Sequence, residues 1–531
     1  MAGAVDRRRF LQWGAVGAAG VASSRFLAAC ATPAAPDGIP FVDAVWDCGV
    51  ASGVHAPDAA VLWTRCVPGA VSAVDLVWEV AADPGFAGIV SAGTVAASPD
   101  GDGTAKALAE GLAPGGTYWY RFRLGSEVSP VGRTRTPAAP GTTPASVRLG
   151  VASCQNFSSG FYPAWRDLAA TDLDAVLHLG DYIYESGGRA GVRPDPIGTA
   201  DTLDGYRAKY RLYRSDADLR AAHAAHAFAP IWDDHEFVNN CSRGSNEADP
   251  ARAAAAYRAW FEYQPVWPIE GTRIYRRVRF GDLADLTLGD TRQYRDPPAD
   301  DSLGLGGFVV PGGATAEIYR PGRSILGDAQ RAWYLDGLGA AQQDGVRWKV
   351  IGNQVMVAPT RILDLDEPSL RALEPGLPEH NGIYLNTDSW DGFLWERDQV
   401  LNFLADERVA NVAFLTGDIH SFWQAPLRAD YDDPRSPVVA QEFVCGSISS
   451  TGPDAIGYDA ARALGDAAKQ LRPGFRYVDL ARRGSAVAEF TPDAARVEFR
   501  VTSAAGRNSA VRRGSVFDWA ADTVNVSLTP G

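Results

Sequence analysis

The chain has 531 residues, of which 46% are hydrophobic and 21% are charged. This length predicts two or more domains, and the ordinary composition excludes a disordered, collagen-like or coiled-coil protein. The net charge of −14 argues against a general nucleic-acid-binding surface, so we infer no nucleic-acid partner. With seven histidines and six cysteines in the whole chain, a histidine-rich metal cage is excluded.

The first 29 residues have the pattern of an export signal. Three arginines at residues 7–9 precede an apolar run of small residues at 13–22. The paired arginines resemble a twin-arginine signal, and residues 27–30 resemble a bacterial lipobox in which Cys30 carries the lipid. A plain export signal cleaved near Ala31 is the alternative. Both predict contact with the export machinery and a periplasmic or cell-surface location, and the lipobox adds a membrane anchor.

A β-rich domain is predicted over residues 45–137, after a tether at 30–44. Tyr118, Tyr120 and Phe122 alternate with other residues at a period of two, which is typical of half-buried strands. The segment 112–118 resembles the tyrosine corner of a fibronectin-type or immunoglobulin-like β-sandwich, although a chance tyrosine at a strand start is the alternative. A linker rich in proline, glycine and threonine follows at 138–146.

The pattern changes to α/β from residue 147 to residue 531. Short apolar, β-branched runs occur at 147–152, 175–179, 227–232, 348–351 and 409–415. Helical stretches occur at 162–170, 203–214, 250–263, 328–341 and 396–406. This alternation predicts a layered α/β domain with a buried sheet.

Polar residues follow each of these apolar runs. The five clusters lie at residues 154–156, 181–185, 233–236, 353–354 and 418–420. Because the carboxyl ends of strands in open α/β sheets form the functional crevice, we expect the clusters to converge. Any one cluster has a helix cap as its simpler explanation, but five together favour a site.

The residue types in these clusters indicate metal chemistry. Four of them offer hard oxygen ligands, which suit Ca²⁺, Mg²⁺ or Mn²⁺: Asp181, Asp234, Asn353 and Asp418. The imidazole of His420, the phenol of Tyr184 and the thiol of Cys154 suit a ferric ion better. Two metals a few Å apart can clamp the attacking and leaving oxygens of a phosphoryl group. The set therefore favours metal-assisted phosphoester hydrolysis.

Three segments resemble variants of the metallophosphoesterase blocks: residues 180–184, 233–236 and 417–420. Asp234, Asp418 and Cys154 stand where the broad superfamily has Asn, His and Asp. This combination resembles the PhoD-type alkaline phosphatases, and the resemblance runs from about residue 45 to residue 503. Purple acid phosphatases share the first block but keep the other two in their usual form. The resemblance implies a β-sandwich followed by a metallophosphoesterase domain.

It also implies an exported monomer that hydrolyses small phosphomonoesters, phosphodiesters or both, with one Fe³⁺ and two Ca²⁺. A phospholipase D-type phosphodiesterase on the same fold is the alternative. Iron is expected on Cys154, Asp181, Tyr184 and His420. Calcium is expected on Asp181 (as a bridge), Asp234 and Asp418, completed by Asn239, Asn240 or Asn353. His235 is expected to orient phosphate or protonate the leaving oxygen, and Arg189, with Arg292 behind it, to bind phosphate.

Four cysteines remain after Cys30 and Cys154 are assigned. Their even number in an exported protein suggests two disulfides, Cys48–Cys66 and Cys241–Cys445. Free buried thiols are the alternative.

Overall fold

The structure is a computed structural model that describes residues 45–67, 72–187, 191–299, 310–311, 317–364, 372, 382–384, 386–433, 435–471, 474–502 and 506–531. The expected signal peptide, the tether with Cys30, and Arg189 lie outside the described residues. Within the described part of the chain, we find no helix with the length and apolarity needed to cross a membrane.

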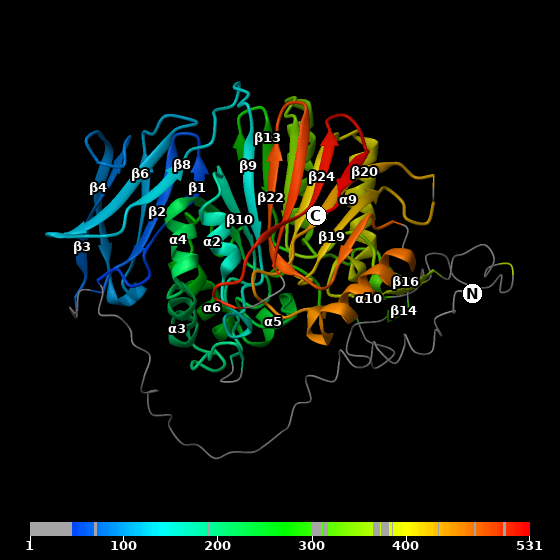
Figure 1. Ribbon diagram of the computed structural model, residues 1–531, viewed down its shortest axis with the longest axis horizontal. Helices are drawn as coiled ribbons and strands as arrows, with labels where there is room; N and C mark the ends of the chain where they lie inside the picture. The colour runs from blue at the N-terminus through cyan, green and yellow to red at the C-terminus, as the bar shows by residue number, and fades with distance from the viewer. Residues whose placement is uncertain are drawn as a thin grey trace, which may run out of the picture.

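Two large sheets form the body of the molecule (Figure 1). The ten-stranded sheet contains the parallel strands β9 (Val147–Ala152), β10 (Ala175–Leu179) and β11 (Ala227–Ile231). The seven-stranded sheet contains the parallel strands β13 (Ala284–Leu288), β15 (Trp348–Asn353), β18 (Val412–Thr416) and β20 (Val438–Val444). The apolar runs predicted from the sequence are therefore confirmed as strands, with ends that differ by at most three residues.

The two sheets face each other across one hydrophobic core. Leu177 and Ile231 of the first sheet belong to the same buried cluster as Leu288 and Val350 of the second. A Cβ atom at Gly352 would lie 3.3 Å from Leu179 Cδ2, so the sheets are in close contact here. Because both faces of the inner strands are covered, these strands are apolar throughout and do not alternate.

Helices cover the sheets, and the predicted ones form close to their expected bounds. They are α2 (Pro163–Ala169), α3 (Leu203–Arg214), α6 (Pro250–Tyr263), α7 (Asp328–Gln343) and α9 (Leu394–Asp406). Shorter or unpredicted helices are α4 (Ala217–Ala225), α5 (Arg243–Ala248) and α10 (Tyr458–Leu471). Proline at N1 and an Asp249 side chain that accepts from Arg252 N–H start α6.

The N-terminal strands form a sandwich, as predicted. One of its sheets contains β4 (Ile89–Ala97), β3 (Val74–Ala81), β6 (Thr117–Leu124), β7 (Glu127–Val128) and β8 (Gly132–Arg135). The tyrosine corner is confirmed, since the Tyr118 hydroxyl accepts from Ala113 N–H at 2.7 Å. The opposite sheet is made of β1 (Val50–Ala56), β2 (Ala59–Arg65) and β5 (Thr104–Glu110).

This sandwich is continuous with the rest of the molecule, which the sequence did not indicate. Strand β1 pairs in parallel with β11, with Ser52 opposite Ala227, so β1, β2 and β5 extend the ten-stranded sheet. At the other end of that sheet, β22 (Arg483–Phe490) pairs with β9 and is followed by β23 (Ala494–Thr502), β24 (Arg512–Ala520) and β25 (Val526–Thr529).

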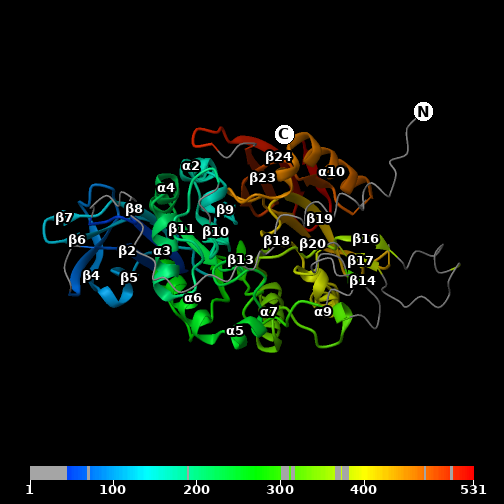
Figure 2. The same cartoon turned by 90° about the horizontal axis from the view of Figure 1, so that it is seen from below.

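The remaining strands complete the second sheet and a small third one. The former are β12 (Arg276–Phe280), β19 (Phe422–Arg428) and β21 (Tyr477–Asp479). The latter are β14 (Val310–Pro311), β16 (Arg361–Asp364) and β17 (Gly382–Tyr384). This small sheet and the sandwich lie at opposite ends of the molecule (Figures 1 and 2).

The expectation of two disulfides is wrong, and the alternative of free thiols is confirmed. Cys48, Cys66, Cys241 and Cys445 are all buried and unpaired. Cys48 belongs to the largest hydrophobic cluster of the described residues, whereas Cys66 belongs to the core of the sandwich. The Cys445 thiol donates to the carbonyl of Val151 at 3.3 Å. Packing in different hydrophobic clusters separates the side chains of Cys48 and Cys66.

Candidate metal centre

The polar loops that follow the strands carry strained backbone. Cys154, Asp181, Asp418 and His420 have φ values of 57°, 57°, 67° and 54°, in the left-handed region that non-glycine residues rarely adopt. Such conformations persist where the surrounding structure enforces them, and they cluster at functional sites. Four of the seven residues that the ligand chemistry selected therefore carry this strain.

The residues expected to hold iron are brought together. Ligand atoms of Cys154, Asp181 and His420 all lie within 4.8 Å of one another. The Tyr184 hydroxyl donates to Asp181 Oδ2 at 2.6 Å and lies 3.1 Å from His420 Nε2. His420 Nδ1 donates to the Thr451 carbonyl at 2.8 Å, which leaves Nε2 facing the cluster. Burial lowers the pKa of His420 to about 4, so the ring is neutral, as a ligand must be.

Two further ligand groups continue from this cluster. Asp181, Asp234 and His235 form one, and Asp233, Asp234 and Asp418 form the other, each with ligand atoms within 4.8 Å of one another. Asp181 is shared by the first two groups and Asp234 by the last two. A carboxylate that belongs to two neighbouring groups has the position of a metal bridge. The sequence assigned Asp181 this role, but it did not assign Asp233.

Arg292 is fully buried among the carboxylates. Its Nη2 donates to Asp233 Oδ2 at 3.1 Å and to Asp418 Oδ1 at 3.2 Å, and its Nη1 donates to Asp388 Oδ2 at 2.6 Å. Arg295 also donates to Asp388, at 2.6 Å. From the sequence, Arg292 was the second candidate after Arg189 for binding phosphate. The structure instead places Arg292 against four aspartates, including Asp234 at 3.7 Å.

The charge balance of this centre fits bound cations. Five carboxylates and two guanidinium groups gather here, and the carboxylates of Asp181, Asp233 and Asp234 are buried whereas those of Asp388 and Asp418 are partly exposed. Burial raises the pKa of Asp418 to about 6, and burial also raises the pKa of Asp181 well above its usual range. Buried carboxylates that lack compensating charge are unfavourable. The oxygen-rich donor set therefore suits divalent cations at one end, and the thiol–phenol–imidazole set suits a ferric ion at the other.

His235 faces this centre from the loop after β11. Its Nδ1 donates to Glu185 Oε2 at 2.6 Å, and its ring lies 4.1 Å from that of Tyr184. Burial lowers the pKa of His235, but the carboxylates of Asp234, Asp181 and Glu185 outweigh that effect and hold it well above its usual value. The His235 side chain is 17% exposed, so a substrate can reach it.

The three candidate asparagines are placed differently. Asn353 is buried, and its Oδ1 accepts from Trp390 Nε1 at 3.3 Å. Asn240 is exposed, and its main-chain N–H donates to Asp234 Oδ2 at 2.6 Å. Asn239 is exposed, and its main-chain N–H donates to Glu185 Oε1 at 3.2 Å. In the case of Asn239 and Asn240, these contacts involve the backbone.

The loops are held by a buried carboxylate that the sequence did not single out. Glu236 accepts from the N–H groups of Asp181 at 3.0 Å, Tyr182 at 2.7 Å and Asp233 at 2.9 Å. Gly180 has φ of +103°, and a Cβ atom there would lie 2.3 Å from Asp233 Cβ. Glycine is therefore required before Asp181, because any side chain would separate the two ligand loops.

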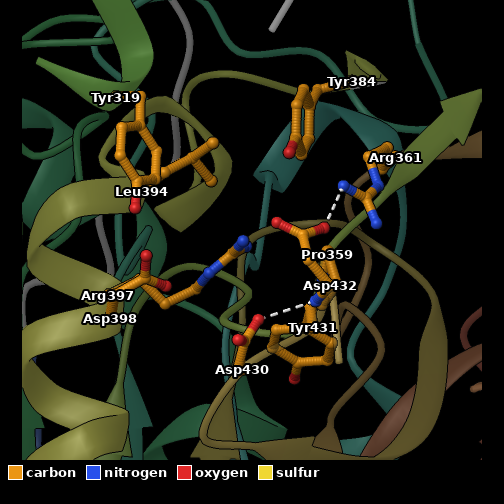
Figure 3. Close-up of a pocket in the computed structure, with 10 residues that line it drawn as sticks. All are labelled: Tyr319, Pro359, Arg361, Tyr384, Leu394, Arg397, Asp398, Asp430, Tyr431 and Asp432. Carbon is orange, nitrogen blue, oxygen red and sulfur yellow. Dashed lines mark hydrogen bonds and ion pairs between the residues drawn. The ribbon is translucent and has the colours of Figure 1, made fainter. Parts of the chain in front are cut away.

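A small pocket lies elsewhere, beside α9 (Figure 3). Its lining includes Tyr384, Arg397 and the ion pair of Arg361 with Asp432, whose N···O distance is 2.6 Å. None of the lining residues belongs to the ligand groups described above.

This arrangement defines a class of protein. Carboxylates shared between adjacent ligand groups, at the carboxyl ends of parallel strands in two facing sheets, are the framework of a metal-dependent phosphoester hydrolase. A family model described as PhoD-like phosphatase matches residues 149–499, and a model for the N-terminal domain of PhoD-like phosphatases matches residues 32–138. The chain therefore belongs to the PhoD-like phosphatase family.

Similarity to individual proteins supports the same family assignment. Alkaline phosphatase D of Bacillus subtilis (strain 168) is 36% identical over 475 residues, which is 84% of this chain and 76% of the relative. A solved structure of PhoD superposes with a TM-score of 0.81 at 32% identity, covering 94% of each chain. Purple acid phosphatase PPD1 of yellow lupin has a TM-score of 0.52 at 12% identity, over 89% of this chain and 73% of that one, which shows likeness of fold.

Proposed function

We propose that this phosphoester hydrolase acts outside the cytoplasm on small phosphomonoesters, phosphodiesters or both, with one Fe³⁺ and two Ca²⁺. The observation that carries the metal assignment is the sharing of Asp181 and Asp234 between three adjoining ligand groups. Cys154, Asp181, Tyr184 and His420 would hold iron. Asp181, Asp234 and Asp418 would hold calcium, with Asn353 or Asn240 completing the sites. Bound metals would supply Lewis-acid stabilisation of phosphoryl charge and an activated nucleophile.

The protein's own groups would orient the substrate and move protons. His235 is fixed through Nδ1 by Glu185, so its Nε2 is the atom available to a substrate. Because neighbouring carboxylates favour its protonated form, His235 can donate a proton to the leaving oxygen. Arg292 balances the charge of Asp233, Asp388 and Asp418. Arg189 keeps its proposed role of binding phosphate.

The test combines metal analysis with a substrate comparison. Export-processed protein should contain one iron and about two calcium ions per chain, and it should hydrolyse p-nitrophenyl phosphate or bis(p-nitrophenyl) phosphate. Cys154→Ala should lose iron and activity, while the matched variant Cys445→Ala, which removes another buried thiol, should keep both. Active protein without iron or calcium would overturn the metal assignment. Faster hydrolysis of phosphatidylcholine vesicles than of either soluble ester would indicate the phospholipase alternative.

The location rests on the N-terminal sequence alone. We propose that residues 1–29 direct twin-arginine export, that Cys30 is lipidated, and that the mature enzyme is a monomer. Detergent phase partition of wild type and Cys30→Ala tests the anchor. Retention of both proteins in the aqueous phase would exclude the lipid, and light scattering of the detergent-solubilised enzyme gives its oligomeric state.

A further inference from the structure

Helix α3 lies where the N-terminal sandwich meets the parallel strands (Figure 2). Tyr206, Lys209 and Tyr213 are spaced by three and four residues, so their side chains leave the helix on one face. Each of the three is buried, and each bonds to the backbone of a loop that carries candidate metal ligands. The family resemblance assigned no role to this helix.

Tyr213 joins two of these loops at a single atom. Its hydroxyl oxygen accepts from the N–H of Phe157 at 3.1 Å and from the N–H of Tyr184 at 3.1 Å. The first N–H belongs to the loop after β9, which contains Cys154, and the second belongs to the loop after β10, which contains Asp181. Both N–H groups lie in buried residues, so loss of the hydroxyl would leave two donors unsatisfied.

The other two residues extend the same contact. Lys209 Nζ donates to the carbonyl of Ser186 at 3.1 Å, at the end of the β10 loop, and pairs with Asp195 at 2.6 Å. The Tyr206 hydroxyl donates to the carbonyl of Phe237 at 2.6 Å, in the loop that contains Asp234. One helical face thus contacts the loops of three adjacent strands.

The opposite side of α3 is docked on the N-terminal domain. Arg211 pairs with Asp102, and Arg207 donates to the carbonyl of Asp100. Asp102 also pairs with Arg65, at 3.1 Å, and accepts from the Tyr263 hydroxyl of α6. Both aspartates belong to the turn that includes η2 (Pro99–Gly101), so the sandwich contacts α3 through this turn.

We propose that α3 is the positioning helix of the metal centre, that Tyr213 is its central positioning residue, and that the N-terminal domain sets the position of α3 through Asp102. This inference rests on the proposed metal centre for its consequence, because the loops that α3 fixes are those that carry Cys154, Asp181, Tyr184 and Asp234. Substitution of residues that orient metal ligands without binding the metal themselves typically changes metal affinity by about 10–100-fold.

The decisive comparison is Tyr213→Phe with Tyr210→Phe in the full-length enzyme. The Tyr210 hydroxyl is buried on the same helix and has no hydrogen-bond partner among the described residues, so its removal tests the loss of a hydroxyl as such. We expect Tyr213→Phe to lower kcat about tenfold at unchanged KM and to retain less metal after dialysis against a chelator. This is the size of effect that is typical for residues that orient metal ligands. Tyr210→Phe should match wild type in both.

Amide hydrogen exchange supplies a readout that does not depend on activity. Peptides covering residues 154–160 and 181–187 should exchange faster in Tyr213→Phe, and peptides from β20 should not. If Tyr213→Phe fails to fold, Asp102→Asn tests the same connection from the other domain. Asparagine tolerates the left-handed φ of 53° at this position, so the variant removes the charge and keeps the turn.

The outcomes separate the two proposals. Wild-type exchange in both loops, or equal effects of Tyr213→Phe and Tyr210→Phe, would overturn the positioning role. Unchanged kcat, metal retention and α3 exchange in Asp102→Asn would overturn the link to the N-terminal domain. Faster loop exchange in Tyr213→Phe together with wild-type protein that binds neither iron nor calcium would leave the positioning role standing and remove the proposed metals.

Discussion

The hydroxyl of Tyr184 donates a hydrogen bond of 2.6 Å to Asp181 Oδ2, three residues earlier in the same loop. The Ser450 hydroxyl donates to the Tyr184 oxygen at 2.7 Å from a distant part of the chain. The phenol oxygen therefore lies next to the shared carboxylate and faces His420. Tyr184 and Asp181 are therefore placed to hold the proposed ferric ion together, with the phenol in its deprotonated form.

Replacement of Tyr184 by Phe should abolish iron binding and reduce kcat/KM by at least about 100-fold, because the phenolate is an iron ligand in the proposed centre. Metal content and the visible tyrosinate-to-iron absorption band provide the measurements. Tyr182→Phe is the matched control, since the Tyr182 hydroxyl turns into the core and contacts His223 Nε2 at 2.9 Å. A Tyr184→Phe enzyme with full iron content would remove the phenolate from the centre.

Glu236→Gln should destabilise the protein by about 1–3 kcal/mol, because an amide offers one acceptor oxygen to the three N–H groups that the carboxylate satisfies. Thermal unfolding of the chelator-treated protein measures the folding effect without metal. The exposed Glu270→Gln provides a control for the change of charge. An unaltered melting temperature for Glu236→Gln would show that the N–H groups find other partners.

Glu185→Gln should reduce kcat about tenfold and alter its pH profile, since Glu185 orients His235 and stabilises its charged form. Removing the anion lowers the pKa of the imidazolium. If His235 donates a proton, the alkaline limb of the profile of kcat should move to lower pH. A profile that keeps its alkaline limb at the wild-type position would exclude His235 as the acid.

Thiol titration of the unfolded mature enzyme should give five free thiols, one for each of the cysteines that the structure leaves unpaired. In the folded enzyme the same reagent should react slowly, because all five are buried. Reductant should leave the melting temperature of the chelator-treated, metal-free enzyme unchanged. A titre of three thiols or one, rising to five after reduction, would show that disulfides form.

Lys349 should make stability rise with pH in the alkaline range. Its side chain is buried in β15 and donates to Gln342 Oε1 at 2.7 Å, and burial lowers its pKa from 10.5 to about 8. Between those values the unfolded chain binds a proton that the folded chain lacks, so stability increases as pH rises from about 8 towards 10.5. Below about 8 both states are protonated and this contribution is constant.

Urea unfolding of wild type and Lys349→Met at pH 7 and pH 10 isolates the effect. The stability of wild type relative to Lys349→Met should be greater at pH 10. An equal difference at the two pH values would place the folded-state pKa of Lys349 near its ordinary value.

Local pattern was sufficient for the strands that lead into the candidate ligands, for five of the long helices and for the ligand types. The apolar runs before Cys154, Asp181, Asp233 and Asp418 form the predicted strands because a fully buried strand is apolar on both faces. Residue chemistry then assigned the thiol and the phenol to a ferric ion and the carboxylate and amide oxygens to divalent cations. Asp388 had no such signal, since it follows no apolar run, and it reaches the centre through Arg292 and Arg295.

The sequence by itself determined which side chains end each strand, because the order of residues along a strand fixes what its carboxyl end presents. The scarce cysteines and histidines limited the centre to a mixture of carboxylates, a phenol and a thiol with few imidazoles. The tertiary structure decided the partners: Arg292 among four aspartates, Tyr213 between two loops, Cys48 and Cys66 in different cores, and β1 alongside β11. Those pairings depend on how the two sheets pack. Residues that meet across the core are far apart in the sequence, and no periodic pattern along the chain indicates that they will be in contact.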